Sequence, residues 1–332
     1  MERAGFAALS AGTIMTTPQE TVLAMTRHIR ETVRPHLGAW HGREISGTAA
    51  SGDATFAIDE IAEEAIVSFI ERKKLSIAYY SEDKGLIEFG ASPEAVLVID
   101  PIDGTRPAIA GFEQCVVSVA WADYAPDVTM GDVKFGCIGE IKSDDLFWAE
   151  RGHGAHWIGP DGSEKAPRLL PVTEFAKAPL TFEVVARPFE WIGKALGEIV
   201  DASSMTGGCF LFNSTAFSLT RLLTGQLAAS MDIGNRILRD YPASRARFLE
   251  LGFGNPIGLF PYDIAAAALI AQEAGAVVTD AYGQSLDTTR LLDTTEANLQ
   301  SILGASNPVL HAALIAALDR GIGRLNIRQE NE

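Results

Sequence analysis

Residues 96–105 combine an apolar run with groups that can hold a cation. The run reads Val-Leu-Val-Ile-Asp-Pro-Ile-Asp-Gly-Thr, so two carboxylates, Asp100 and Asp103, follow an apolar stretch of strand length. Gly104 and Thr105 then add a flexible backbone and a hydroxyl. Hard divalent cations such as Mg²⁺ are bound by oxygen ligands of this kind. The run therefore suggests a metal site beside an anion-binding turn, which is the equipment of a phosphatase.

Three further acidic residues stand at the ends of expected elements. Glu82 follows a strand-like apolar run, as Asp100 does. Asp59 lies at the start of an amphipathic helix, and Asp263 lies in the first turn of an apolar helix. A single acidic residue is usually a solvated surface charge, and Asp263 could simply cap its helix. Because several of these acidic residues follow the ends of expected strands, we expect their carboxylates to lie close together.

The composition limits the classes of partner. The chain has 332 residues, of which 47% are hydrophobic, and this is enough for a large core that splits into two domains or one elongated one. The formal net charge is −16. This balance argues against a nucleic-acid partner, because nucleic-acid binding depends on a basic surface. It does not argue against a small phosphorylated metabolite, since bound metals can reverse the local field.

The cysteines and the N-terminus indicate a cytoplasmic protein. Cys115, Cys137 and Cys209 are odd in number, far apart and without metal-ligand spacing, as expected in a reducing compartment. No run of residues is apolar enough for a membrane span. Residues 5–15 faintly resemble a signal sequence, but the charged residues before them do not fit one. We interpret residues 1–16 as an N-terminal tail.

Two halves of the chain differ in the order of their expected elements. Residues 17–178 form an α+β domain, in which helices precede a run of strands. Residues 179–332 form an α/β domain, in which strands and helices alternate. The expected helices are 17–33, 58–70, 214–223, 264–274 and 309–318; the expected strands are 77–80, 96–99, 115–121, 133–141, 145–149, 182–185 and 277–279. Residues 233–260, with four arginines and several Gly and Pro, are interpreted as an inserted loop.

The acidic run resembles a known family signature. Asp100-Pro-Ile-Asp-Gly-Thr105 is similar to the signature of the inositol monophosphatase family, the Mg²⁺-dependent, lithium-sensitive phosphatases that include fructose-1,6-bisphosphatase and 3'(2'),5'-bisphosphate nucleotidase. Further similar segments follow in family order over roughly residues 45–290. They are the Thr-x-x-Asp segment within 53–59, Ser-Glu-Asp at 81–83, residues 147–155, Tyr-Asp-Ile-Ala-Ala at 262–266 and Glu-Ala-Gly at 273–275.

The resemblance implies a fold and a set of ligands. The fold would be a layered α/β/α/β/α sandwich with the active site between the two halves, the first carrying most metal ligands and the second supplying Asp263. Two or three Mg²⁺ ions, with Mn²⁺ as a possible substitute, would be held by Glu82, Asp100, Asp103, Asp263 and the carbonyl oxygen of Ile102. Asp59 would hydrogen-bond Thr105, and this pair would orient or deprotonate the attacking water. Backbone N–H groups of Gly104 and Thr105 would bind phosphate if they open a short helix.

Several positions depart from the family pattern or leave a role open. Arg106 and Pro107 replace the usual residues after Gly-Thr, and Arg106 is either a cation near the phosphate or a surface arginine. Asp232 falls near the position of an acid that contacts substrate hydroxyls in inositol phosphatases, or it is a plain surface acid. The arginines of the insertion, Arg236, Arg239, Arg245 and Arg247, bind a second phosphate or belong to a solvated basic loop.

The resemblance implies a phosphoric monoester hydrolase. The expected reaction is hydrolysis of inositol monophosphate or a related sugar phosphate by metal-activated water. Fructose-1,6-bisphosphate and 3'-phosphoadenosine 5'-phosphate remain open as substrates. An inactive relative that acts as a binding or regulatory subunit is the alternative from another class. Family members are commonly homodimers, and we expect the same of this chain.

Overall fold

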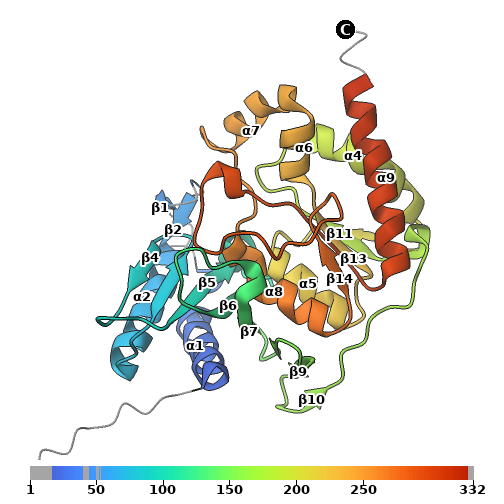
Figure 1. Ribbon diagram of the computed structural model, residues 1–332. Coiled ribbons are helices and arrows are strands. Elements are labelled where there is room, and N and C mark those ends of the chain that lie inside the picture. Colours follow the sequence, from blue (N-terminus) through green and yellow to red (C-terminus); the bar gives the residue numbers. More distant parts are fainter. Residues whose placement is uncertain (1–16, 40–44, 50–51, 53, 328–332) are drawn as a thin grey trace, which may run out of the picture.

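The computed structural model describes residues 17–39, 45–49, 52 and 54–327 (Figure 1). The expected N-terminal tail, residues 1–16, and Asp53 of the Thr-x-x-Asp segment lie outside the described residues. The described chain forms two large sheets and a two-stranded hairpin, with helices packed on the sheets in layers. No helix of the described residues is both long and apolar enough to cross a membrane.

The first large sheet has eight strands and is built before residue 178. Its spatial order is β10-β9-β8-β7-β6-β5-β3-β4, and only β3 and β5 pair in parallel. The strands are β3 Ala78–Ser81, β4 Gly85–Glu88, β5 Ala95–Asp103, β6 Val116–Asp123, β7 Val133–Glu140, β8 Leu146–Glu150, β9 Ala155–Ile158 and β10 Glu164–Lys165. β5 is buried along its whole length, which explains its unbroken apolar run.

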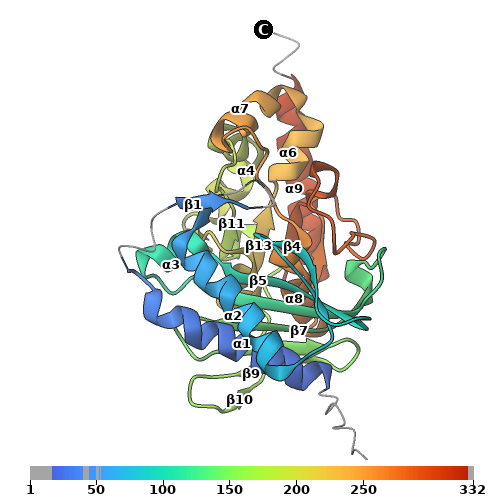
Figure 2. The same cartoon turned by 90° about the vertical axis from the view of Figure 1, so that its left-hand side faces the viewer.

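Two helices cover the outer face of this sheet. They are α1, Pro18–Val33, and α2, Ala57–Lys73, and they lie side by side in Figure 2. α1 begins with a capping box, in which Thr17 and Glu20 each accept a hydrogen bond from the other's backbone N–H. The hairpin of β1, Ile45–Thr48, and β2, Ala54–Phe56, leads directly into α2.

The second large sheet has five strands and is built after residue 179. Its order is β12-β11-β13-β15-β14, with β11 parallel to both of its neighbours and β15 antiparallel to both of its own. The strands are β11 Leu180–Phe182, β12 Cys209–Phe210, β13 Ala229–Asp232, β14 Val277–Thr279 and β15 Ile302–Ala305.

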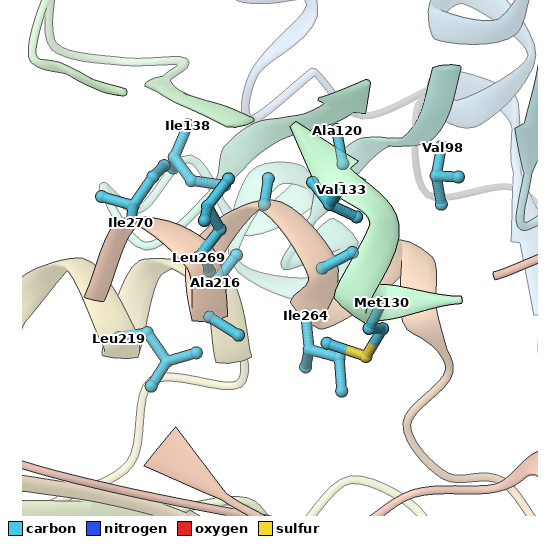
Figure 3. Close-up of a cluster of buried hydrophobic side chains, with 14 of the residues drawn as sticks. Val98, Ala120, Met130, Val133, Ile138, Ala216, Leu219, Ile264, Leu269 and Ile270 are labelled. Carbon is cyan, nitrogen blue, oxygen red and sulfur yellow. The ribbon is translucent and has the colours of Figure 1, made fainter. Parts of the chain in front are cut away.

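Two helices fill the space between the sheets. They are α5, Thr215–Leu223, and α8, Pro261–Glu273, which pack against each other, α8 mainly against the first sheet and α5 against β13 of the second. α8 is apolar nearly all round, as a helix covered on every side must be. Figure 3 shows Ile264, Leu269 and Ile270 of α8 near Ala216 and Leu219 of α5, in a shared core with strand residues.

Two further helices cover the outer face of the second sheet. They are α4, Phe189–Ser203, and α9, Pro308–Ile327 (Figure 1). The layers therefore run α1 and α2, first sheet, α5 and α8, second sheet, α4 and α9. This order confirms the expected α/β/α/β/α sandwich.

The segment 233–260 is not the inserted loop that we expected. It forms α6, Gly234–Asp240, a 3₁₀ turn at Pro242–Ser244, and α7, Arg245–Leu251. Ile237 and Phe248 are buried in the core of the second sheet. The segment is therefore part of the fold, because these apolar side chains leave water together with the helices that carry them.

Candidate metal centre and substrate pocket

A pocket lies where the end of β5 and the start of α3, Thr105–Ala110, meet residues of the second half of the chain. Eight of the ten predicted site residues line it: Glu82, Asp100, Ile102, Asp103, Gly104, Thr105, Arg106 and Asp263. The other two, Asp59 and Asp232, do not line it. Arg106 thus belongs to the pocket rather than to the outer surface.

Three carboxylates form the centre of this pocket. One oxygen from each of Asp100, Asp103 and Asp263 lies within 4.8 Å of the others. In a regular strand, residues three apart face opposite sides of the sheet. The pairing of β5 with β6 shifts between Asp100 and Asp103, and such an irregularity re-aims side chains. All three donors are carboxylate oxygens, the donor type that suits a hard divalent cation.

Burial of three neighbouring carboxyl groups disfavours their ionised forms unless a cation lies beside them. Burial, followed by repulsion from neighbouring carboxylates, holds the pKa of Asp100 well above its usual range. Burial and the nearby Asp103 raise the pKa of Asp263 in the same way. Burial raises the pKa of Asp103 to about 6, against the opposing effect of its hydrogen bonds. Bound positive charge would stabilise the ionised forms of all three groups.

Backbone N–H groups hold some of the carboxylates in place. The backbone N of Ile102 donates to Oδ1 of Asp100 at 3.0 Å. The backbone N of Phe260 donates to Oδ2 of Asp263 at 2.7 Å, at the start of α8. Asp263 therefore caps α8 and also lies close to Asp100 and Asp103. A role as a helix cap and a role as a metal ligand are compatible for this residue.

The expected contact between Asp59 and Thr105 is present. Thr105 Oγ1 lies 3.2 Å from Asp59 Oδ1 and 3.1 Å from the carbonyl oxygen of Ile102. Asp59 is fixed at the start of α2, where its Oδ2 accepts from the backbone N of Phe56 at 2.8 Å. Since Asp59 does not line the pocket, it reaches the reaction site through Thr105.

Gly104 makes the turn from β5 into α3. Its φ of 92° lies in the left-handed region that favours glycine. A Cβ atom at this position would lie 2.4 Å from the carbonyl oxygen of Gln114. Another residue here would therefore displace the turn. The short helix that we expected after Gly104 does begin at Thr105.

Residues of the second half of the chain donate hydrogen bonds to Asp103, and the sequence analysis did not predict these contacts. Ser214 Oγ donates to Asp103 Oδ2 at 2.8 Å, and the backbone N of Ala216 donates to the same oxygen. Ser214 is also the N-cap of α5. Asp103 therefore sits at the N-terminus of this helix, where negative charge is favoured. A serine before an apolar helix indicates an N-cap. The neighbouring sequence does not indicate which distant carboxylate that serine contacts.

Glu183 and Arg187 also line the pocket, although the sequence analysis did not predict them as site residues. Arg187 is buried and pairs with Asp232, whose side chain is 1% exposed. The reading of Asp232 as a plain surface acid is therefore wrong. The carboxylate of Asp232 faces Arg187. A contact of Asp232 with substrate hydroxyls stays a prediction. Burial, with the nearby Asp232, raises the pKa of Glu183 to about 8.

The turn that carries Arg187 is strained. Ala186 has a φ of 52°, in the left-handed region that non-glycine residues rarely occupy. The Arg187 side chain also donates to the carbonyl oxygen of Val185 at 2.5 Å. Strain of this kind is often held at functional sites by the surrounding structure.

The arginines of residues 233–260 do not line the pocket. Arg236 is buried and pairs with Asp240 and Asp319. Arg239 donates to backbone carbonyl groups, while the two others form ion pairs. The segment is helical rather than a loop, although Arg245 and Arg247 are exposed on α7. A contact of these arginines with a second phosphate stays a prediction.

Comparisons with known proteins agree with this geometry. The model of the inositol monophosphatase family matches residues 19–322. The chain is 27% identical over 301 residues to a fructose-1,6-bisphosphatase/inositol-1-monophosphatase of Methanothermobacter thermautotrophicus, covering 89% of this chain and 94% of that relative. It is 31% identical over 233 residues to the Nus factor SuhB of Vibrio cholerae, covering 70% of this chain and 74% of the relative.

Solved structures share the fold. The SuhB protein of Bartonella henselae matches with a TM-score of 0.66 and 19% identity, over 91% of this chain and 98% of that one. The inositol monophosphatase of Thermotoga maritima matches with a TM-score of 0.65 and 18% identity, over 92% and 98%. With the family model matched over most of its length, this chain belongs to the inositol monophosphatase family, a family of phosphatases.

Proposed function

We propose that this enzyme hydrolyses a small phosphate monoester with the help of Mg²⁺ held by Asp100, Asp103 and Asp263. The observation that carries the proposal is the approach of these three carboxylates to within 4.8 Å in a pocket between the two halves of the chain. Glu82 and the carbonyl of Ile102 would complete the ligand set from the same pocket. When bound, two or three such ions would neutralise the phosphate and acidify the attacking water.

The remaining pocket residues would position the phosphate and move a proton. The backbone N–H groups of Gly104 and Thr105 stand at the start of α3, where they would bind phosphate oxygens. Arg106 would add a cation to that part of the pocket. Thr105 would accept the proton of the attacking water as its own hydroxyl proton passes to the carboxylate of Asp59, 3.2 Å away. Phosphate monoesters hydrolyse very slowly in water, so positioning and charge neutralisation dominate the catalytic effect.

We propose inositol monophosphate or a related sugar phosphate as the substrate. The Methanothermobacter relative is named for both inositol monophosphate and fructose-1,6-bisphosphate. The same pocket is also lined by Glu183 and by Arg187, whose charge is met by Asp232. These two side chains suit hydroxyl groups better than a second phosphate, which would need uncompensated positive charge. This favours a monophosphate over a bisphosphate.

A panel of phosphate esters tests the proposal. Phosphate release should be measured from inositol 1-phosphate, fructose-1,6-bisphosphate and 3'-phosphoadenosine 5'-phosphate, with Mg²⁺, with Mn²⁺ and with a chelator. We expect Mg²⁺-dependent release that is fastest from a monophosphate and is inhibited by Li⁺. An absence of release from every ester in Mg²⁺ would favour the inactive, regulatory relative instead. Light scattering of the same sample tests the expected homodimer.

A further inference from the structure

Two acidic residues of the first large sheet lie in one row across its strands. Asp103 of β5 pairs with Val116 of β6, and Val116 pairs with Glu140 of β7. Residues directly opposite each other in antiparallel strands point to the same face of a sheet. Neighbouring strands are about 4.8 Å apart, so the backbones at Asp103 and Glu140 are about 10 Å apart. A proposed metal ligand and Glu140 therefore share one face of the sheet.

Helix α5 lies across this row and is bonded to both carboxylates. It contacts each of β5, β6 and β7. At its start, Ser214 Oγ and the backbone N of Ala216 donate to Asp103. In its last turn, Nη2 of Arg221 donates to Oε1 of Glu140. From Ser214 or Ala216 to Arg221 the helix rises by about 8–11 Å, which matches the spacing of the two carboxylates.

The ion pair of Arg221 and Glu140 is buried and held from several sides. The two residues are 9% and 5% exposed. The guanidinium carbon of Arg221 lies 4.3 Å from the ring centre of Phe217 and 5.4 Å from that of Phe147. The second carboxylate oxygen of Glu140 accepts from Ser143 Oγ at 2.8 Å. Both partners are therefore fixed in position as well as paired in charge.

A gain in stability does not by itself account for a buried ion pair at this place. Apolar residues of similar volume often stabilise a protein as well or better, because no charge has to leave water. The apolar contacts of α5 in the shared core are non-directional. The ion pair is directional, and a buried polar pair can fix the register of one element on another. The pair thus holds α5 along its own axis, over the row that contains Asp103.

We propose that Arg221 is a positioning residue for the metal centre. By pairing with Glu140 it sets the position of α5, and α5 in turn orients Asp103 through Ser214. The inference rests on the proposed function, because Asp103 is a ligand of the proposed Mg²⁺ site. Neither Arg221 nor Glu140 lines the pocket, so neither contacts the metal or the substrate itself.

Calorimetric titration of the full chain with Mg²⁺, without substrate, tests this role. The variant Arg221→Met/Glu140→Met removes the ion pair, keeps the net charge and leaves no unpaired charge in the core. We expect it to fold, which urea unfolding checks, and to bind Mg²⁺ about three- to tenfold more weakly. Partners that bond a metal ligand directly contribute more, roughly 10–100-fold. In a Ser214→Ala background the same two changes should weaken binding by a smaller factor, because residues of one network are not additive.

Two further variants sharpen the test. Arg221→Lys keeps the charge but loses the planar guanidinium and its contacts, and it should weaken Mg²⁺ binding by at least about twofold. Arg30→Met is the control, because Arg30 is 7% exposed and pairs with Asp144 on the side of the sheet that α1 covers. Its loss should lower the stability of the fold and leave the Mg²⁺ affinity unchanged.

Three results would each overturn the role of Arg221. They are an unchanged Mg²⁺ affinity in both Arg221 variants, an equal loss of affinity in Arg30→Met, and losses that add fully to that of Ser214→Ala. A different result marks failure of the proposed function. If the unaltered chain bound no Mg²⁺, the metal centre itself would be refuted, and the role of Arg221 with it.

Discussion

Ser214 of the second half of the chain donates its hydroxyl proton to Asp103 of the first half, with 2.8 Å between Oγ and Oδ2. The same oxygen accepts from the backbone N of Ala216. A carboxylate of the proposed metal centre is therefore held by the N-terminus of α5, which also packs against α8, the helix of Asp263. The position of α5 thus helps to fix proposed ligands from both halves of the chain.

We predict that Ser214→Ala weakens metal binding more than it weakens the fold. Partners that orient metal ligands typically contribute about 10–100-fold to metal affinity. Losing the N-cap and the hydrogen bond should cost about 1–2 kcal/mol of unfolding free energy. Turnover should fall at low Mg²⁺ and recover at high Mg²⁺. Ser218→Ala is the control, because Ser218 is buried on the same helix but bonds a backbone carbonyl; an equal Mg²⁺ requirement in both variants would argue against the role of Ser214.

We predict that Thr105→Val lowers kcat by about 10²–10⁴, the usual contribution of a positioned acid–base group. Asp59→Asn should have a similar effect, and the double variant should be little worse, because residues that act as a unit are not additive. Steady-state kinetics measure this. Thr32→Val, which removes a hydroxyl bonded to a carbonyl on α1, should leave kcat unchanged. Additive losses at Asp59 and Thr105 would contradict a shared role.

We predict that Arg187→Met destabilises the protein by about 3–5 kcal/mol, because it leaves Asp232 charged and buried without its partner. Adding Asp232→Asn should restore part of the loss. Urea unfolding of the single and double variants measures the coupling. The exposed pair of Arg247 and Glu250 is the comparison, and Arg247→Met should cost less than about 1 kcal/mol. An equal loss of unfolding free energy in Arg187→Met and Arg247→Met would mean that burial does not set the strength of the Arg187–Asp232 ion pair.

We predict that the metal-free protein loses stability as pH rises from about 4.5 to 8. Burial raises the pKa of Glu183 from its ordinary value of 4.5 to about 8 in the folded state. The folded protein therefore holds a proton that the unfolded chain has lost, and ionisation of the buried group opposes folding. At about 1.4 kcal/mol per unit, the loss from this group by pH 8 is on the order of 4 kcal/mol.

The variant Glu183→Gln isolates that effect. It should be more stable than the unaltered chain at pH 8, and the difference should shrink toward pH 4.5. Urea unfolding in a chelator at several pH values measures it. Glu94→Gln, at an exposed position, should leave the pH profile as it is. A parallel profile for Glu183→Gln and the unaltered chain would show that Glu183 does not titrate in this range.

The acidic residues of the candidate site could be predicted from the sequence because their signals are local. Asp100 and Asp103 stand at the end of the buried strand β5, while Asp59 and Asp263 stand in the first turns of α2 and α8. Such positions depend on strand and helix ends, which apolar periodicity marks well. The pairing of Asp59 with Thr105 came from the family resemblance and matches the structure.

The contribution of Arg187 to the pocket could not be predicted in the same way. Arg187 reaches the pocket from a turn in which Ala186 adopts a positive φ, and nothing in an Ala-Arg-Pro sequence indicates that conformation. Its partner, Asp232, is 45 residues away in the chain. The helices α6 and α7 were missed for a related reason. They are short, and burial of Ile237 and Phe248 in the tertiary structure stabilises them rather than local helix propensity.

Turnover by Asp100→Asn tests the central claim most directly. An asparagine side chain can keep the hydrogen bond from the backbone N of Ile102 through its amide oxygen, so the variant should fold as the unaltered chain does. It removes one negative ligand from the group formed with Asp103 and Asp263. Phosphate release from the best ester of the panel in saturating Mg²⁺ should therefore fall to background. If the folded variant kept most of its activity, the assignment of the metal centre to these carboxylates would be wrong.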